Sequence, residues 1–97
     1  MDIAVVDGVI HVSGEIDLMT APELEACLGA VDGGVLIDMI GVTFVDSVGL
    51  RVLITQHHRQ LREGAALRIV AMSQPVQRLL EITGLLPILT EGPALSA

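Results

Sequence analysis

Residues 35–50 have the sequence VLIDMIGVTFVDSVGL, and the order of its parts decides the fold. Residues 35–39 are a short, nearly continuous apolar run, which is typical of a strand covered on both faces. After this run, residues recur at the spacing of one face of an amphipathic helix, which predicts a helix there. These residues are Leu50, Leu53, Ile54, His57 and Leu61. Ser47 stands between the two patterns, so we expect it to cap a helix that runs to about Glu63. Such a serine is either an ordinary cap or a residue that receives a phosphate.

Turn and cap signals divide the rest of the chain. Asp7-Gly8 favours a tight hairpin turn between two strands within residues 3–12. Thr20 and Glu23 are spaced as a capping box at the start of a first helix, with Pro22 in its first turn. Gly64 and Gly84 are placed to end the second and third helices.

The remaining strands alternate with helices. Residues 67–71 form an apolar strand, and residues 86–89 are interpreted as a last edge strand. Strands that alternate with helices predict an α/β domain with a mixed, largely parallel sheet of 4–5 strands and helices packed against it. We expect this domain over residues 1–90 and a short flexible tail over residues 91–97.

Composition excludes several classes of function. The chain of 97 residues carries five basic and twelve acidic residues, a net charge of −7, which argues against nucleic acid or an anionic membrane as a partner. Cys27 is the only cysteine, so no internal disulfide is expected. No apolar run approaches the roughly 20 residues of a membrane span. Asp2 and the lack of early basic residues argue against a signal peptide, and a cytoplasmic protein is expected.

The sequence gives little support for a catalytic site or a metal site. His57 and His58 are adjacent, so on a helix their side chains point about 100° apart and share a metal ion poorly. The chain contains no Gly-x-Ser-x-Gly elbow, and both histidines follow Ser47 by two to three helical turns. We therefore expect no enzyme activity, no metal and no cofactor.

Three segments together resemble the STAS domain of the small bacterial anti-sigma factor antagonists. The likeness spans residues 3–90, and the second segment is the most specific. The segments are Gly14-Glu15-Ile16-Asp17 leading into Thr20-Ala21-Pro22-Glu23-Leu24; Val35-Leu36-Ile37-Asp38 followed by Gly41 to Leu50; and Gly64 before a strand, followed by Val76, Leu79, Leu80 and Gly84-Leu85.

The resemblance implies a switch between partners. The unmodified antagonist binds an anti-sigma factor that is also an ATP-dependent serine kinase, and this binding frees a sigma factor. The kinase phosphorylates the serine after the motif's aspartate, which is Ser47 here, and the complex dissociates until a phosphoserine phosphatase resets it. A rival from the same family is a constitutive interaction subunit, such as the small STAS component of a lipid-transport ATPase complex.

The resemblance also implies a docking rim around Ser47. Its expected partner-binding residues are Asp46, Val48, Gly49, Asp17 and Thr20. Gly49 is expected to permit close backbone approach, and Leu50 to pack inward. The family often carries a second hydroxyl residue where this chain has Val48, which leaves Ser47 as the only hydroxyl within residues 46–50.

Overall fold

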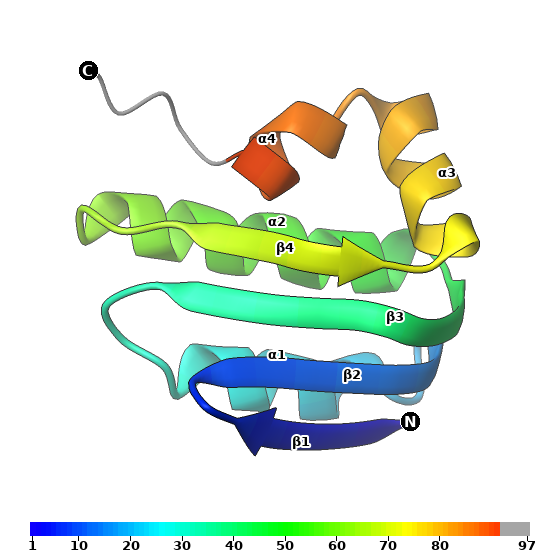
Figure 1. Ribbon diagram of the computed structural model, residues 1–97, viewed down its shortest axis with the longest axis horizontal. Coiled ribbons are helices and arrows are strands. Elements are labelled where there is room, and N and C mark those ends of the chain that lie inside the picture. The colour runs from blue at the N-terminus through cyan, green and yellow to red at the C-terminus, as the bar shows by residue number, and fades with distance from the viewer. Residues whose placement is uncertain (92–97) are drawn as a thin grey trace.

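In the computed structural model, which describes residues 1–91, one mixed sheet carries helices on one face and along one edge (Figure 1). The sheet order is β1-β2-β3-β4, with β1 antiparallel to β2 and the other two pairs parallel. This architecture confirms the predicted fold class. The elements in chain order are β1 (Asp2–Val6), β2 (Val9–Ile16), α1 (Ala21–Gly29), β3 (Val35–Val45), α2 (Ser47–Arg62), β4 (Leu67–Met72), α3 (Gln74–Thr83) and α4 (Leu86–Glu91).

The hairpin between β1 and β2 follows from its two turn residues. Asp7 has φ 51° and Gly8 has φ 80°. A two-residue hairpin loop with positive φ at both positions matches the twist of the strands on either side, and an Asp-Gly pair adopts it readily. Val6 consequently pairs with Val9, and β1 lies at the edge of the sheet.

Strand β3 is longer than the sequence pattern predicts. It continues through residues 40–45, and its pairing with β2 runs to Ile16 and Val45 after a register shift near Gly41. A Cβ atom at Gly41 would lie 2.8 Å from Cβ of Ser13, so the close approach of the two strands requires glycine there. Because β3 is extended in this way, Ser47 lies directly at its carboxyl end.

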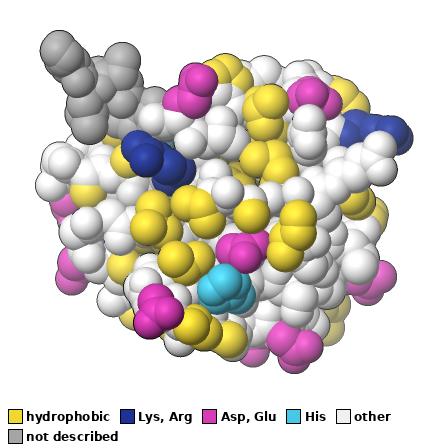
Figure 2. Space-filling view, viewed as in Figure 1, with side chains coloured by type: hydrophobic (Ala, Val, Ile, Leu, Met, Phe, Trp, Pro, Cys, Tyr) yellow, Lys and Arg dark blue, Asp and Glu magenta, His cyan; other side chains and the backbone are white. Residues whose placement is uncertain are grey.

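Only one face of the sheet is covered. Helices α1 and α2 lie behind the sheet in Figure 1, and the core lies between them and the inward residues of β2, β3 and β4. The expectation that residues 35–39 are covered on both faces is therefore wrong. Leu36 is 42% exposed and Ile40 is 64% exposed on the open face, where hydrophobic side chains gather in Figure 2. On the same face Nδ1 of His11 lies 3.0 Å from Oδ2 of Asp38.

The end of the described chain also differs from the expectation. Residues 86–89 are the start of helix α4, not an edge strand. Gly84 has φ 76° and ends α3 in the left-handed region, as predicted, and the chain then turns so that Leu89 is buried. Helix α4 packs against β4. Glu91 belongs to α4, so the predicted tail over residues 91–97 begins too early, and residues 92–97 lie outside the described residues. Within residues 1–91, no helix has the length and apolar character needed to cross a membrane.

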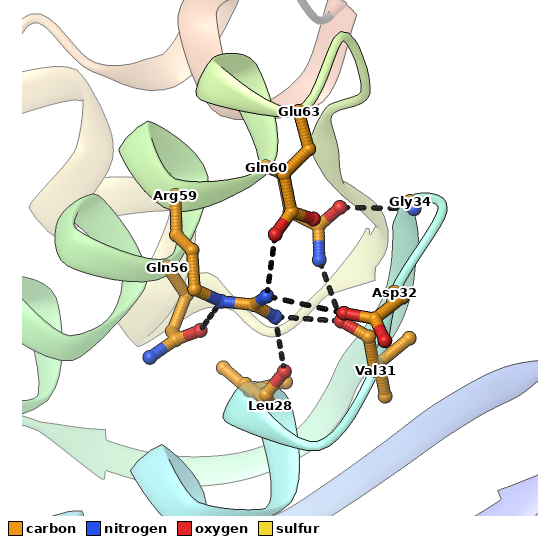
Figure 3. Close-up of polar contacts among 8 residues, drawn as sticks. All are labelled: Leu28, Val31, Asp32, Gly34, Gln56, Arg59, Gln60 and Glu63. Atoms are coloured by element: carbon orange, nitrogen blue, oxygen red, sulfur yellow. Dashed lines mark hydrogen bonds and ion pairs between the residues drawn. The ribbon is translucent and has the colours of Figure 1, made fainter.

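A polar network fixes the C-terminal end of α2 (Figure 3). The Arg59 guanidinium donates through Nη2 to the carbonyl oxygens of Leu28 (3.1 Å) and Val31 (2.6 Å), and its Nη1 lies 3.4 Å from Oδ1 of Asp32. The Gln60 side chain is fully buried; its Nε2 donates to the Val31 carbonyl and its Oε1 accepts from the Gly34 N–H, both at 2.9 Å. These bonds join the last turn of α1 and the loop that follows it to the end of α2, and the Leu28 carbonyl accepts from the Val31 N–H as well.

The buried stripe of α2 differs from the predicted one near this end. Leu61 is exposed, while the polar side chains of Gln56, His57 and Gln60 are buried. The stripe follows Leu50, Leu53, His57 and Gln60, because Gln60 finds partners on the loop before β3. Burying a polar group costs little free energy when the group is hydrogen-bonded. Gln60 therefore lies on the buried face of α2, and Leu61 lies on its exposed face.

Candidate functional site

The start of α2 is capped by Asp46. The N–H groups of Val48 and Gly49 donate to Oδ1 of Asp46, at 3.0 Å and 3.1 Å, and the backbone of Asp46 is extended, as an N-cap requires. The expectation that Ser47 is the cap is therefore wrong: Ser47 is the first residue of the helix. Both residue types cap helices well, and the carboxylate takes the role here because it also suits the positive end of the helix dipole.

The Ser47 hydroxyl consequently has no structural role within residues 1–91. Its side chain is exposed, and the hydroxyl makes no hydrogen bond to another residue within 1–91. A hydroxyl in this position is accessible to a reagent or an enzyme from solution. The geometry thus assigns the two functions predicted for this segment to different residues. Asp46 caps the helix, and Ser47 has the exposed hydroxyl that could receive a phosphate.

The loop before α1 lies beside this helix start, as the resemblance implies. The Asp46 N–H donates to the Ile16 carbonyl at 3.2 Å, which joins the end of β2 to the residue before Ser47. Asp17 follows directly and shapes the loop: its Oδ1 accepts from the N–H groups of Met19 (2.9 Å) and Thr20 (3.1 Å). The structure therefore brings the segment containing Asp17 and the start of α2 to one rim.

Thr20 stabilises this loop in a way that the sequence does not reveal. Its hydroxyl donates to the Glu15 carbonyl at 2.9 Å and accepts from the Asp17 N–H at 2.9 Å. No side-chain capping bond forms at Thr20, so the predicted capping box with Glu23 is wrong. The hydroxyl is engaged by the loop on its N-terminal side, and the rim is held in a defined shape by local bonds.

A shallow groove of about 250 Å³ runs between α1 and α2 next to this rim. Leu18 on its margin is 70% exposed, and the neighbouring Met19 is 84% exposed. The groove therefore has an apolar margin beside Ser47, with one acidic and one basic side chain. Its lining residues are Leu18, Ala21, Pro22, Glu25, Val48, Arg51, Val52 and Thr55.

Gly49 belongs to the interior, and its expected role in partner binding stays a prediction. It is buried, and a Cβ atom there would lie 2.6 Å from Cγ2 of Ile16 and 2.9 Å from Cγ2 of Val45. Glycine is required because α2 crosses the ends of two strands at this point. Leu50 is buried, as predicted. Of the expected rim residues, Val48 lines the groove, while Asp17, Thr20 and Asp46 use their polar atoms to hold the rim.

The histidines of α2 form no metal site. The ring centroids of His57 and His58 lie 6.3 Å apart, and the described residues contain no group of three or more potential ligands that could hold a metal ion. His57 is buried, and its Nδ1 has no hydrogen-bond partner. Burial lowers the pKa of His57 below its ordinary value, as does the neighbouring His58, while a hydrogen bond with the backbone of Leu67 opposes the shift. His57 is thus a core residue whose burial favours the neutral form.

The family model of the STAS domain matches residues 1–96. The chain belongs to the STAS domain family. The architecture described above agrees with this assignment: a crystal structure of an anti-sigma factor antagonist from Mycobacterium paratuberculosis superimposes with a TM-score of 0.72 and 37% identity, over 86% of this chain and 75% of that one. The structure of the anti-sigma factor antagonist SpoIIAA in its unphosphorylated form shares the fold, with a TM-score of 0.68 and 23% identity over 89% of this chain and 82% of that one.

Curated members of the STAS family extend the comparison. The anti-sigma-B factor antagonist of Listeria monocytogenes is 37% identical over 84 residues, which are 82% of this chain and 74% of that protein. The anti-sigma-B factor antagonist of Staphylococcus aureus is 34% identical over 80 residues, which are 78% of this chain and 74% of that protein. The sequence-based identification of a STAS domain is thereby confirmed.

Sequence reasoning did not find the groove beside Ser47. Leu18 and Met19 are large apolar residues in a segment that also contains the loop signals Gly14 and Asp17, and apolar residues in a loop are a sign of an exposed surface. Arg51 follows Ser47 by four residues, a spacing that places both side chains on one face of a helix. Both signals are present in the sequence, and their relation to the groove appears only when α1 and α2 are placed side by side.

Proposed function

We propose that this STAS protein is an anti-sigma factor antagonist controlled by phosphorylation of Ser47. The unphosphorylated form binds an anti-sigma factor that is also a serine kinase and so releases a sigma factor. The exposed hydroxyl of Ser47, relieved of capping by Asp46, is the observation that carries the proposal. The relatives named anti-sigma-B factor antagonists support the choice of partner. In this role the chain is a kinase substrate and a binding module, not an enzyme.

The docking surface of this proposal is the rim and groove at the start of α2. It offers Val48 and the exposed Leu18 as apolar lining of the groove, and the exposed Met19 follows Leu18 in the chain. Exposed apolar side chains gathered beside a groove suit the hydrophobic centre of a protein interface. The net charge of −7 favours a partner with basic groups around that centre.

Phosphorylation of Ser47 weakens binding because it adds negative charge to the interface. A phosphoserine carries about −1.5 to −2 charges at neutral pH. A partner surface fitted to a neutral hydroxyl would have to desolvate this group. One partner carboxylate about 5 Å away would repel each unit charge by roughly 3 kcal/mol at an effective dielectric constant near 20. Because 1.4 kcal/mol is a factor of ten, affinity falls about a hundredfold or more without any refolding of the domain.

The test uses Ser47 variants and a serine-kinase anti-sigma factor encoded in the same genome. Ser47→Asp is expected to lose binding by about a hundredfold in calorimetry, for the charge reason just given. Ser47→Ala is expected to bind like the wild type and to gain no phosphate in intact-mass measurements with the kinase and ATP. A phosphoserine phosphatase should remove the phosphate from the wild type and restore binding.

Two outcomes would contradict this function. If Ser47→Asp binds as tightly as the wild type, charge at residue 47 does not control the complex, and a constitutive interaction subunit of a larger assembly is favoured. If the wild type gains no phosphate from any serine-kinase anti-sigma factor of its own genome, Ser47 is not the switch. Gln77→Asp is the matched control, because it places the same charge on the exposed side of α3, outside the rim and groove, and should leave binding unchanged.

A further inference from the structure

The helix start has little capacity left to neutralise a phosphate on Ser47. Oδ1 of Asp46 already accepts from the N–H groups of Val48 and Gly49, and the Asp46 carbonyl accepts from the Leu50 N–H at 3.0 Å. Of the donors in the first turn, only the N–H of Ser47 itself remains. The Asp46 carboxylate also repels a neighbouring phosphate. Within the domain, compensation for the new charge therefore has to come from a side-chain cation.

Most of the five arginines are badly placed for this task. Arg59 is committed to the network at the end of α2. Arg62 follows Ser47 by fifteen residues, which is about 22 Å along a helix. Arg68 lies near the amino end of β4, and because β4 is parallel to β3 this is the end of the sheet away from Ser47. Two arginines, Arg51 and Arg78, remain.

Arg51 has the better geometry of the two. It follows Ser47 by four residues on α2, and Cβ atoms at this spacing lie about 5–6 Å apart on one face of a helix. Long side chains on helices lean toward the N-terminus, so the turn that contains Ser47 is within reach of the Arg51 guanidinium. Arg51 is exposed and forms no ion pair within residues 1–91. Arg78 lies on another helix, in a hollow shared with Val45.

We infer that Arg51 is the internal counter-ion of phosphorylated Ser47. This inference rests on the proposed function and adds a second effect of the modification. In the unmodified protein Arg51 lines the groove, where Glu25 is the acidic side chain among the lining residues. Once Ser47 is phosphorylated, the guanidinium pairs with the phosphate across one helical turn. Phosphorylation thus adds an anion at the rim and also withdraws a cation from the groove.

The test measures the second ionisation of the phosphate directly. Phosphoserine is inserted at residue 47 by genetic encoding, and its ³¹P NMR signal is followed from pH 4 to pH 8. An adjacent guanidinium favours the dianion, so Arg51→Gln should raise the second pKa, with an acid dissociation constant about twofold lower than in the wild type. Arg51→Lys keeps the charge and should retain most of the effect. Circular dichroism verifies that each variant is folded.

Arg78→Gln is the matched control, since it removes an exposed arginine at a similar site on α3. It should leave the phosphate titration unchanged. A second readout is the ¹⁵N–¹H signal of the Arg51 side chain, which should shift when Ser47 carries the phosphate and stay in place when it does not. Equal titrations of wild type and Arg51→Gln would overturn the inference, and a change found only in Arg78→Gln would assign the pair to Arg78 instead.

Failure of this inference and failure of the proposed function can be told apart. The phosphate is installed without a kinase, so the titration does not depend on any partner. A shifted titration together with tight binding of Ser47→Asp would keep the ion pair and reject the switch. An unshifted titration together with loss of binding by Ser47→Asp would keep the switch and reject Arg51 as its counter-ion.

Discussion

The two ends of α2 differ in what their polar residues do. At the C-terminal end, Arg59 and Gln60 are bonded to backbone groups of α1 and the loop that follows it, so their polarity serves the fold (Figure 3). At the N-terminal end, Asp46 closes the helix and leaves the Ser47 hydroxyl exposed. A helix fixed at one end can present a chemically reactive group at the other, because changing that group does not disturb the anchor.

The strongest test of this contrast is Gln60→Leu. This change leaves the N–H of the half-buried Gly34 without its bond to Oε1 of Gln60, and the Val31 carbonyl without its bond from Nε2, which together should lower the free energy of unfolding by about 2 kcal/mol. Urea denaturation measures the loss. Gln77→Leu, on the exposed side of α3, is the control and should change the free energy of unfolding by less than about 0.5 kcal/mol. Equal effects of the two substitutions would show that the buried network does not anchor α2.

Gly49→Ala tests how tightly the start of α2 packs against the strands beneath it. The added methyl would meet Ile16 and Val45 at 2.6 Å and 2.9 Å, so a loss of about 1–2 kcal/mol is expected in urea denaturation. Gly29→Ala, in the last turn of α1, is the control. Its methyl would lie 3.8 Å from Nε2 of Gln56, an ordinary contact, and should cost nothing. A harmless Gly49→Ala would mean that the helix start can move.

Asp46→Ala separates capping from the exposed hydroxyl. Loss of the two bonds to the Val48 and Gly49 N–H groups should lower the free energy of unfolding by about 1 kcal/mol. Ser47→Ala should change it by less than about 0.5 kcal/mol, because no bond of the fold is lost. Thermal or urea denaturation of both variants decides the matter. If Ser47→Ala is the more costly change, Ser47 takes part in the cap after all.

The smallest expected effect is a change in the pH dependence of stability. Burial lowers the pKa of His57 in the folded protein, so the unfolded chain binds the proton more readily as the pH falls below about 6.5. The free energy of unfolding should therefore decrease between pH 7.5 and pH 5.5, and His57→Leu should reduce this decrease. Urea midpoints at the two pH values measure it. His58→Gln should reduce the decrease by less than His57→Leu, because burial is the larger cause of the lowered pKa of His57 and His58 the smaller. A slope unchanged by His57→Leu would contradict the prediction.

The element order and the hairpin followed from local patterns, whereas the errors arose where local patterns are ambiguous. Asp46 and Ser47 are both good helix caps, so neighbouring sequence could not choose between them. The short apolar run at residues 86–89 is compatible with a strand or a helix, and packing of Leu89 decided for the helix. The sequence pattern favours Leu61 over Gln60 for the buried face, because the partners of Gln60, Val31 and Gly34, come from a distant part of the chain.

In the candidate site, too, features set by local sequence could be predicted, and features set by contacts between distant segments could not. The motif around Ser47 identified the segment, and the pairing of Asp46 with Ile16 confirmed that the loop beginning at Asp17 lies next to it. The groove between α1 and α2 was not predicted, because its lining comes from two helices whose relative position depends on the whole core. The interior position of Gly49 was missed for the same reason.

The bonds of Arg59 to the carbonyls of Leu28 in α1 and of Val31 just after it also bear on how the domain folds. Helix α1 has nine residues, no basic side chain in its last turn and no side-chain bond at its start. A helix of this length is marginal by itself in water. We therefore expect α1 to be stable only when it packs against α2, so that the two helices melt as one cooperative unit. Amide protons near Leu28 should then exchange with solvent only in openings that also release α2.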